Sequence, residues 1–454
     1  MIIAPRLQKI NGLLGPGITK TLIGRYLLSL LLGFISHRGR MSAQQAAWAV
    51  ADQPRHRANV GRFLKKHGHQ LAWLAGRAAR RLLAAAAPRG TFVFLVDTTF
   101  VGHQGDCTEN TFSTGNRQRR PTKHRRYGKQ KHARRRCHAF VCGLLLTPDG
   151  VRIPSGLCYH TPGYCRRHRL TWRTQADLAA ELIRAVAVPP RAEVIVLGDT
   201  GFESKQVRAA CAVRGFYWIL PANPERVLAG AKPRPKLWSL AQEMDGRRFV
   251  PLRLSLNQGH WTAMRRLSPA RRGSKNHTRT FYVHEEKRDV RSLGVTRIVF
   301  STKQKPTPDK PLVRDQTKLL LSNAPHFSSG QIVELYTLRW QIELFFKELK
   351  SCLGLHQYRF RSFATVEAWV QACLITFIYL EWVRVQGLSR SKVPPRQQTA
   401  WLSRRTYGLA LAVWERLEED QIQTLHRHAQ TPGGIKKLRR LLHAALPKEL
   451  QIAA

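Results

Sequence analysis

The chain begins with apolar positions at helical spacing. They recur in TKTLIGRYLLSLLLGFISH (19–37), SAQQAAWAVAD (42–52) and HRANVGRFLKKHG (56–68). Ser42 is a suitable N-cap for the second segment, and Gly68 is expected to end the third. We therefore predict a region of short helices over residues 1–90. Its basic character is compatible with a DNA-binding helix-turn-helix, although such bundles also occur without any ligand.

The pattern changes to strands near residue 91. Continuous or alternating apolar runs rich in β-branched and aromatic residues occupy TFVFLVDTTFVG (91–102), CHAFVCGLLLT (137–147), GVRIPSGLCYH (150–160), AEVIVLGDTGF (192–202) and FYWILPA (216–222). Pro148-Asp149-Gly150 joins the second and third as a hairpin. Helices are predicted between the later strands, one capped by Thr174 and one ending at Gly215. The first and fourth strands lead into Asp97 and Asp199.

Residues 222–327 form short strands separated by Gly, Pro and basic turns. The candidates are FVPLRLSL (249–256), HWTAMRRLS (260–268), TRTFYVHEE (278–286), VTRIVFST (295–302) and KLLLSNA (318–324). Helical spacing resumes near Ser328 and continues through an apolar segment at 364–385. We therefore predict an α/β chain whose domains are a helical region at 1–90, a core at 91–221 completed by helices at 328–385, a β-rich insertion at 222–327 and a helical basic region at 386–454.

One helix, YTLRWQIELFFKELK (336–350), carries a polar edge. At about 100° per residue, its large apolar side chains share one arc: Leu335, Leu338, Ile342, Phe345, Phe346 and Leu349. Tyr336, Arg339, Glu343 and Lys350 share the adjoining arc. Such a rim can hold a carboxylate near another element, but Arg and Glu four residues apart also occur as an ordinary surface pair. The helix alone leaves both interpretations open.

Length and composition indicate the size of the core, and net charge indicates the class of partner. The chain has 454 residues, of which 43% are hydrophobic, enough for a large core in two or three domains. Lys and Arg number 76 against 28 Asp and Glu, so the formal net charge is +48. A folded chain with this self-repulsion is best neutralised by a polyanion, which makes nucleic acid the expected partner.

An anionic membrane is the competing polyanion. No run of about 18 uncharged apolar residues is present to span a bilayer. Residues 21–35 carry Arg25 and lack a small-residue cleavage site, which favours a buried helix over a signal peptide. The apolar segment 364–385 contains two Glu and one Arg, which favours core packing. We therefore expect a cytoplasmic protein without a membrane partner.

Eight unevenly spaced cysteines do not form a disulfide framework, and a reducing compartment fits them. Four of them lie in one stretch with two histidines: Cys137, Cys142, Cys158, His160, Cys165 and His168. Zinc is one interpretation of this stretch, but the spacings match no standard zinc-ligand set. Buried thiols are the expected state.

The densest charge run of the chain, residues 117–136, holds 11 Lys or Arg and no acid. It interrupts the predicted sheet instead of ending the chain, so phosphate contact is favoured over a solvated tail. The candidate DNA contacts are His103, Arg119, Arg125, Arg126, Lys129, Arg134, Arg135 and Arg136.

Asp97 and Asp199 at strand ends, with Glu343 on a helix beside the core, suit a two-metal phosphoryl-transfer site. Carboxylate oxygens are preferred ligands of Mg²⁺, and two such ions can serve the attacking and the leaving oxygen. Each aspartate alone is also compatible with a structural turn, an Asx turn in the case of Asp199. Their joint occurrence in this element order, in a chain of this charge, favours the metal site.

These residues resemble a known family. Tyr336, Arg339, Glu343 and Lys350 match in type and spacing the YREK signature of insertion-sequence DDE transposases. The β-β-β-α-β-α-β order resembles the ribonuclease H-like catalytic core of these proteins, and residues 222–327 lie where they carry a β insertion. The resemblance covers roughly residues 91–380.

The resemblance implies a cut-and-paste transposase that cleaves double-stranded DNA at the terminal inverted repeats of a mobile element and joins the 3′-hydroxyl to target DNA. It implies that Asp97, Asp199 and Glu343 bind two Mg²⁺ ions, with Mn²⁺ as a substitute. It also implies a homodimer on paired ends. Phosphates near the terminal nucleotides would contact Tyr336, Arg339 and Lys350, and a flipped base would stack on a tryptophan, for which the candidates are Trp238 and Trp261.

Two rival functions fit part of this pattern. A non-catalytic DNA-binding protein derived from a transposase would share the basic charge and the helical N-terminal region, but would be expected to lose at least one of the three acids. A structure-selective nuclease would need the acids but not Tyr336, Arg339 and Lys350 at these helical positions. The complete set favours the transposase.

Overall fold

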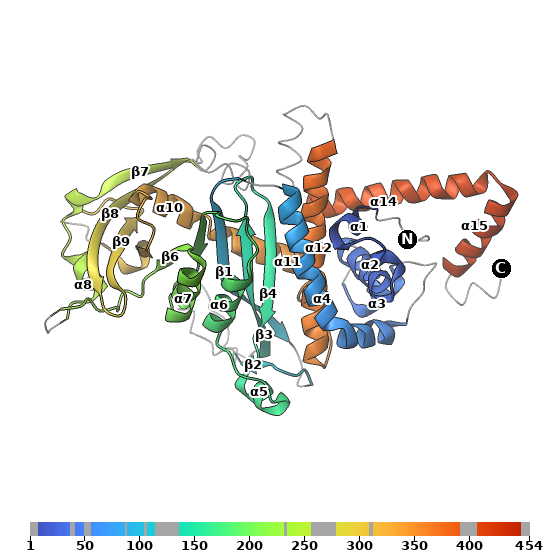
Figure 1. Ribbon diagram of the computed structural model, residues 1–454, viewed down its shortest axis with the longest axis horizontal. Coiled ribbons are helices and arrows are strands. Elements are labelled where there is room, and N and C mark those ends of the chain that lie inside the picture. The colour runs from blue at the N-terminus through green and yellow to red at the C-terminus, as the bar shows by residue number, and fades with distance from the viewer. Residues whose placement is uncertain are drawn as a thin grey trace, which may run out of the picture.

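The structure is a computed structural model. It describes residues 8–36, 41–49, 56–86, 89–103, 107–113, 136–230, 234–255, 278–307, 312–390 and 406–445, and the statements below concern these residues. One mixed sheet runs through the centre, with helices on both of its faces and a helical region beyond one face (Figure 1).

The sheet has ten strands in the order β2-β3-β1-β5-β6-β10-β9-β8-β7, with β4 paired to β3 as well. The strands of its first half are β1 (Phe92–His103), β2 (Phe112–Ser113), β3 (Arg136–Leu146), β4 (Arg152–Cys158), β5 (Val194–Leu197) and β6 (Tyr217–Pro221). β1 is antiparallel to β3 and parallel to β5, and β5 is parallel to β6. This is the predicted ribonuclease H-like arrangement.

The insertion extends this sheet. Its strands are β7 (Val250–Ser255), β8 (Thr278–Val290), β9 (Gly294–Thr302) and β10 (Thr317–Ser322). β10 pairs antiparallel with both β6 and β9, so the core and the insertion share a continuous backbone hydrogen-bond ladder. The predicted strand at 260–268 lies outside the described residues.

Predicted turn and cap residues act as expected in the core. Residues 147–150 form the turn between β3 and β4. Thr174 and Asp177 form a reciprocal capping box at the start of α6 (Gln175–Ala185). α7 (Lys205–Arg214) ends at Gly215, which has a φ of 63°. Because these signals are local in sequence, the element boundaries here could be predicted closely.

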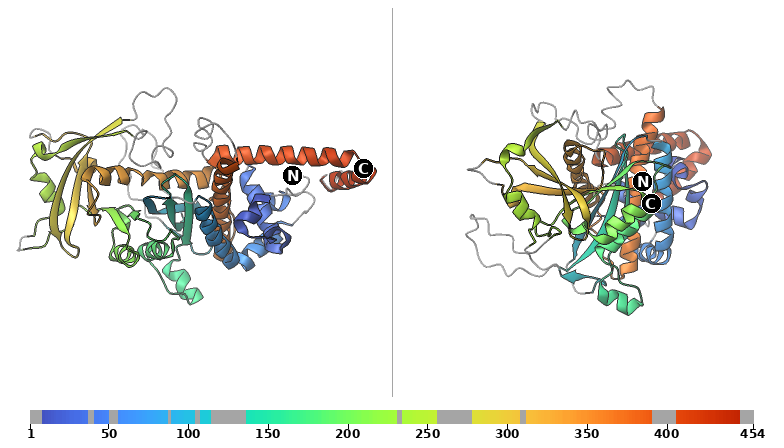
Figure 2. Two further views of the ribbon diagram at one scale, coloured as in Figure 1. Left: turned by 45° about the horizontal axis from the view of Figure 1, so that its top comes forward. Right: turned by 60° about the vertical axis from the view of Figure 1, so that its left-hand side comes forward.

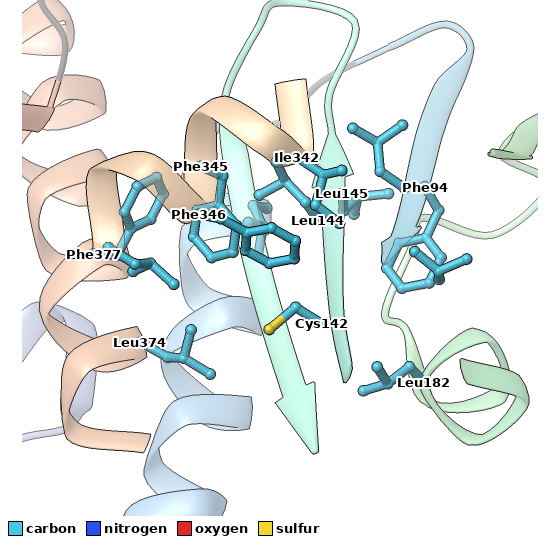
Figure 3. Packing of buried hydrophobic residues seen from close by; sticks show 14 of the residues in the cluster. Phe94, Cys142, Leu144, Leu145, Leu182, Ile342, Phe345, Phe346, Leu374 and Phe377 are labelled. Atoms are coloured by element: carbon cyan, nitrogen blue, oxygen red, sulfur yellow. The ribbon is translucent and has the colours of Figure 1, made fainter. Parts of the chain in front are cut away.

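Helices α6 and α7 pack on one face of the core sheet, and α4 (Arg57–Ala86), α11 (Trp340–Ser351) and α12 (Phe363–Arg390) pack on the other. Figure 3 shows Phe345 and Phe346 of α11 on the α12 side of β3. Phe345 meets Phe377 of α12 edge to face, with ring centroids 4.9 Å apart. The predicted apolar stripe of this helix is buried throughout.

α12 is the one helix among the described residues that is long and apolar enough to cross a membrane, and 83% of its apolar window is buried inside the protein. It lies along α4 (Arg57–Ala86) and contacts β4 on the sheet. Burial by α4 and the sheet accounts for its composition, as expected for core packing.

The N-terminal region contains α1 (Gln8–Leu14), α2 (Leu22–Ile35) and α3 (Ala43–Trp48). Ser42 caps α3 as predicted. The prediction that the third helix ends at Gly68 is wrong, because α4 continues to Ala86 with a kink at His67. A Cβ atom at Gly68 would lie 3.3 Å from the Cβ of Ala368 in α12, so this glycine serves the close approach of two helices.

The C-terminal region consists of α14 (Thr406–Ala429) and α15 (Pro432–Ala445). The first turns of α14 pack on α2 and α12 through Leu409, Ala410 and Val413. Its later turns extend away from the rest of the molecule, and α15 folds back beside them (Figures 1 and 2).

Candidate active site

Asp97 lies in the middle of β1. The expectation of an aspartate at the end of its strand is wrong, since β1 continues to His103. The parallel ladder between β1 and β5, however, ends at Leu95 and Leu197. Beyond this point β1 keeps only its antiparallel partner β3, so the side of β1 that faces away from β3 becomes open at Asp97.

Asp199 occupies the matching position on the neighbouring strand. It follows Leu197 by two residues, as Asp97 follows Leu95, so the two aspartates leave adjacent parallel strands at the same level. Asp199 accepts a hydrogen bond from the N–H of Gly201 at 2.9 Å. The predicted Asx turn is therefore present, and it fixes the carboxylate without excluding a second role.

Glu343 comes from a helix that is divided in two. We expected one helix over residues 336–350, but α10 (Ser329–Thr337) and α11 are separated at Leu338 and Arg339. At this junction Arg339 donates its N–H to the carbonyl of Tyr336 at 3.1 Å, the closer spacing of a 3₁₀ turn. The tightened turn places Arg339 at the N-terminal cap position of α11.

The Arg339 guanidinium bridges two of the acids. Its Nη1 lies 3.3 Å from Oδ2 of Asp97, and its Nη2 lies 3.1 Å from Oε1 of Glu343. The arginine and Asp97 are mostly buried, whereas Glu343 is 41% exposed. The pair at positions 339 and 343 is therefore more than a surface ion pair, because it ties the helix to the central strand.

The other two members of the polar quartet also contact the two acidic strands. The hydroxyl of Tyr336 donates to the carbonyl of Gly198, next to Asp199, at 3.5 Å. Nζ of Lys350 donates to the carbonyl of Phe100 in β1 at 2.9 Å. All four residues thus lie along one line from the end of β5 to the second half of β1.

The pKa values of the site residues reflect their burial and the nearby acids. Burial raises the pKa of Asp97 from 3.8 to about 6, and the charges of Asp199 and Glu343 add to this, against the opposing effects of the Thr98 N–H and Arg339. Burial raises the pKa of Tyr336 to about 12, and Asp199 and Asp97 contribute in the same direction. Burial also lowers the pKa of Lys350 from its ordinary value.

Asp97 is expected to destabilise the metal-free protein at neutral pH. Well below its ordinary pKa of 3.8, the carboxyl group is protonated in both the folded and the unfolded state, so it has no effect. Between about pH 4 and pH 6 the unfolded state ionises first, and stability falls by about 3 kcal/mol. Thermal unfolding in the presence of a chelator should therefore show that Asp97→Asn is more stable than the parent at pH 8 but not at pH 4. Equal stability at pH 8 would contradict the raised pKa.

The donor set fits divalent ions of the Mg²⁺ type. Asp97 and Glu343 pair with the guanidinium of Arg339, and the charge of Asp199 acts on Asp97. The three carboxylates exceed the one arginine by two negative charges if all are ionised, and every one of these donors is an oxygen. Among the described residues, no three His, Cys, Asp or Glu side chains already lie as a coordinating group. At Asp97 and Glu343 the reason is visible, because the cation between them is Arg339.

The remaining predicted residues fall into a described and an undescribed group. Trp238 lies on α8 (Leu237–Gln242) of the insertion and is partly buried against the apolar core. Arg136 is the first residue of β3 and pairs with Ser113 and His103. Trp261 and six basic-loop candidates lie outside the described residues: Arg119, Arg125, Arg126, Lys129, Arg134 and Arg135.

The cysteine and histidine stretch forms no metal group. The Cys137, Cys142, Cys158 and Cys165 thiols are buried and separate, as expected for structural cysteines. His160 pairs with Glu367 at 2.8 Å, and the His168 ring packs at a tilt of 31° against Tyr164, with ring centroids 4.1 Å apart.

Sequence reasoning missed a buried clamp beside Asp199. The carboxylate of Glu203, four residues further on, pairs with Arg208 of α7 and with Arg226 at the start of the insertion. The Glu203 side chain is 3% exposed. No local pattern marks this residue, because its partners lie on two other segments of the chain.

Comparisons with known proteins identify the family of the chain. The family model described as Transposase DDE domain matches residues 88–379. Over 80 residues the chain is 38% identical to the putative transposase InsL for insertion sequence element IS186A of Escherichia coli (strain K12) and to the transposase for insertion sequence element IS421 of Escherichia coli. These stretches cover 17% of this chain and 21% of each relative. Since the family match covers more than half of the chain, this protein belongs to the DDE transposase family.

Proposed function

We propose that the protein is a DNA transposase that uses Asp97, Asp199 and Glu343 for metal-dependent cleavage at the ends of a mobile element and for strand transfer into target DNA. The observation that carries this proposal is that Asp97 and Glu343 pair with one arginine, while Asp199 leaves the neighbouring strand at the level of Asp97 and its charge raises the pKa of Asp97. A structural ion pair needs one carboxylate for one arginine, and this site has an excess of acid.

Asp97, Asp199 and Glu343 would hold two Mg²⁺ ions, with Mn²⁺ as a substitute, and the ions would supply Lewis-acid stabilisation of the attacking and leaving oxygens. The residues around them would orient the DNA. Arg339 can exchange its two carboxylates for a phosphate, to which its fork donates in the same manner. Tyr336 stays neutral and donates its hydroxyl, and Lys350 stands at the far end of the same line.

The remaining parts of the proposal rest on charge and on the family. The basic loop, from Arg119 to Arg136, would contact phosphates, as the net charge of +48 suggests. The active form would be a homodimer that pairs two double-stranded ends carrying the terminal inverted repeats. We place it in the prokaryotic cytoplasm, associated with the nucleoid. Trp238 and Trp261 remain candidates for base stacking.

Cleavage of defined DNA tests this function. We expect the purified protein and Mg²⁺ to release a 3′-hydroxyl at the end of a duplex carrying the terminal repeat of its own element, and to join that end to a second duplex. A duplex with a scrambled repeat is the control. The products resolve on a denaturing gel.

Two results would favour the rivals. Binding of the repeat without any cut, in Mg²⁺ or Mn²⁺, would favour a DNA-binding protein that has lost the chemistry. Equal cutting of the scrambled duplex without strand transfer would favour a nuclease.

A further inference from the structure

A basic lobe follows β4 at the edge of the core sheet. It consists of α5 (Pro162–His168) and the segment that continues to Arg173. Figure 1 shows α5 projecting beyond the end of the sheet. The lobe contains five Arg or His residues, and the chain has no acid between Asp149 and Asp177. A surface of this charge attracts an anion.

The lobe has a fixed base. Tyr164 and Cys165 are the buried residues of α5, and Tyr164 meets Phe363 of α12 edge to face, with ring centroids 5.5 Å apart. Asn110 fixes the backbone that leads into α5, since its side-chain amide donates to the carbonyl of Tyr159 at 2.9 Å and accepts from the N–H of Thr161 at 2.8 Å. The exposed side chains of the lobe are therefore presented by a rigid support, which lowers the entropy lost on binding.

Three exposed guanidiniums of the lobe lack a carboxylate. Arg173 pairs with Glu181, but Arg166, Arg167 and Arg169 have no ion pair with any described residue. Other exposed arginines in the described chain also lack an ion pair, as Arg191 does, so the distinguishing feature of the lobe is that three of them lie within four residues. Uncompensated arginines that lie next to one another repel, so their proximity favours an external anion.

Arg169 occupies a backbone position that suits glycine. It caps α5 with a φ of 54°, and its N–H donates to the carbonyls of Arg166 and Cys165. α7 ends in the same way, but there the residue is Gly215. A left-handed conformation is costly for a side chain with a Cβ atom. A glycine at position 169 would therefore fit the backbone, which makes a substitution by glycine a clean way to remove this side chain.

The apolar content of the lobe favours nucleic acid among the possible anions. Trp172 is 48% exposed, and its Nε1 donates to the Tyr159 hydroxyl at 3.4 Å, which holds the ring in one orientation. A fixed, exposed indole beside guanidiniums can pack on a sugar or stack on a base while the arginines contact phosphates.

The lobe is close to the acids. Cys158, the last residue of β4, pairs with Phe140, which pairs with Thr99, two residues after Asp97. Two strand spacings of about 4.8 Å place Cys158, four residues before α5, roughly 10 Å across the sheet from Thr99. This short separation is the reason to look for contacts between the lobe and DNA held at Asp97.

We propose that this lobe is a second DNA-contact surface, in which Arg166, Arg167 and Arg169 bind phosphates beside the cleaved bond and Trp172 packs on an adjacent nucleotide. The proposal rests on the proposed function, since it takes DNA as the substrate. It adds a subsite that lies outside the helix edge of Tyr336, Arg339, Glu343 and Lys350.

The backbone of Arg169 permits a sharp test. Arg169→Gly removes the charge and relieves the left-handed strain, so the variant should unfold at the same temperature as the parent or a higher one. Arg191→Gly is the matched control, because Arg191 is also exposed with a φ of 60° but lies in the turn before β5, at the opposite end of the strand from Asp199. Both are measured by anisotropy of a labelled end-bearing duplex over a range of salt concentrations.

We expect Arg169→Gly to weaken DNA binding and to lower the slope of log K against log salt by about 0.9, while Arg191→Gly leaves both as in the parent. Adding Arg166→Ala and Arg167→Ala should bring the loss of slope to roughly 2.7. Trp172→Leu should weaken binding several-fold without a change in slope, because it removes an uncharged contact.

Unchanged affinity and slope in the triple variant, with a parent that binds and cuts the duplex, would overturn this inference and leave the proposed function standing. Equal losses in Arg169→Gly and Arg191→Gly would also overturn it, since they would reflect net charge alone. A parent that binds no DNA would overturn the proposed function and this inference together.

Discussion

Replacing Asp97 by Asn, Asp199 by Asn or Glu343 by Gln is expected to lower the rate of DNA strand cleavage by a factor of at least about 10³, which corresponds to about 4 kcal/mol of lost transition-state stabilisation. Each change keeps the shape of the side chain and removes one negative charge. The effect should be similar for all three, because each acid contributes one of the negative charges that would bind the metal ions. Cleavage of an end-bearing duplex in Mg²⁺, measured under single-turnover conditions, gives the rates.

DNA binding separates this effect from loss of structure. All three variants should bind the duplex at least as tightly as the parent, since a negative charge near the phosphates has been removed. Asp245→Asn is the matched control, because Asp245 is an acid paired with an arginine on the insertion surface, and it should cut at the parental rate. If Glu343→Gln cuts as fast as the parent, the pair between Arg339 and Glu343 is structural and the site needs a different third ligand.

The core sheet could be predicted from sequence because its signals are local. The run from Phe92 to Val96 is uniformly apolar, as expected for a strand buried on both faces, and Pro148-Asp149-Gly150 specifies its own turn. The end of β1 could not be predicted in this way. Residues 98–103 continue to pair with β3, and this long-range pairing carries the strand past Asp97.

Two helix predictions failed for a related reason. Gly68 usually signals a helix end, but in this chain it lets α4 approach Ala368, a residue 300 positions later. The division between α10 and α11 has no Pro or Gly to mark it. It lies at Leu338 and Arg339, where the arginine turns toward Asp97 on a different element. Contacts between distant segments override helical spacing at both places.

The identity of the site residues was more accessible than their arrangement. Tyr336, Arg339, Glu343 and Lys350 share one arc on a helical wheel, and the structure places all four beside the two acidic strands. A helical wheel does not show which residues of other elements each side chain contacts. Arg339 looks like the partner of Glu343 alone, whereas Asp97, 242 positions earlier, is its second partner.

A second large effect is expected at a buried ionic network behind the site. Arg152 of β4 lies 2.7 Å from Glu348 of α11 and 3.0 Å from Glu381 of α12, and its Nη2 donates to the hydroxyl of Thr406 in α14 at 3.3 Å. Glu381 also pairs with Arg384. Burial opposes ionisation of Arg152, but Glu348 and Glu381 raise its pKa above the ordinary value. One guanidinium thus joins a strand and three helices.

Arg152→Met should lower the free energy of unfolding by about 3–5 kcal/mol, because it leaves Glu348 and Glu381 buried against Arg384 alone. Arg173→Ala, which breaks an Arg–Glu pair of 41% and 44% exposed side chains, should cost no more than about 1 kcal/mol. Denaturant unfolding followed by tryptophan fluorescence compares the two variants with the parent.

The uncompensated charge, and not lost packing, is the expected cause, and a double variant distinguishes the two. Adding Glu348→Gln to Arg152→Met removes the stranded carboxylate and leaves Glu381 with Arg384, so about 1–2 kcal/mol should return. No recovery would mean that the contact between Arg152 and Phe377, 5.0 Å from guanidinium carbon to ring centroid, matters more than the charges. Glu348 is also five residues from Glu343 on the same helix. If Arg152→Met also slows cleavage, and the double variant restores cleavage together with stability, the network holds α11 where Glu343 faces Asp97.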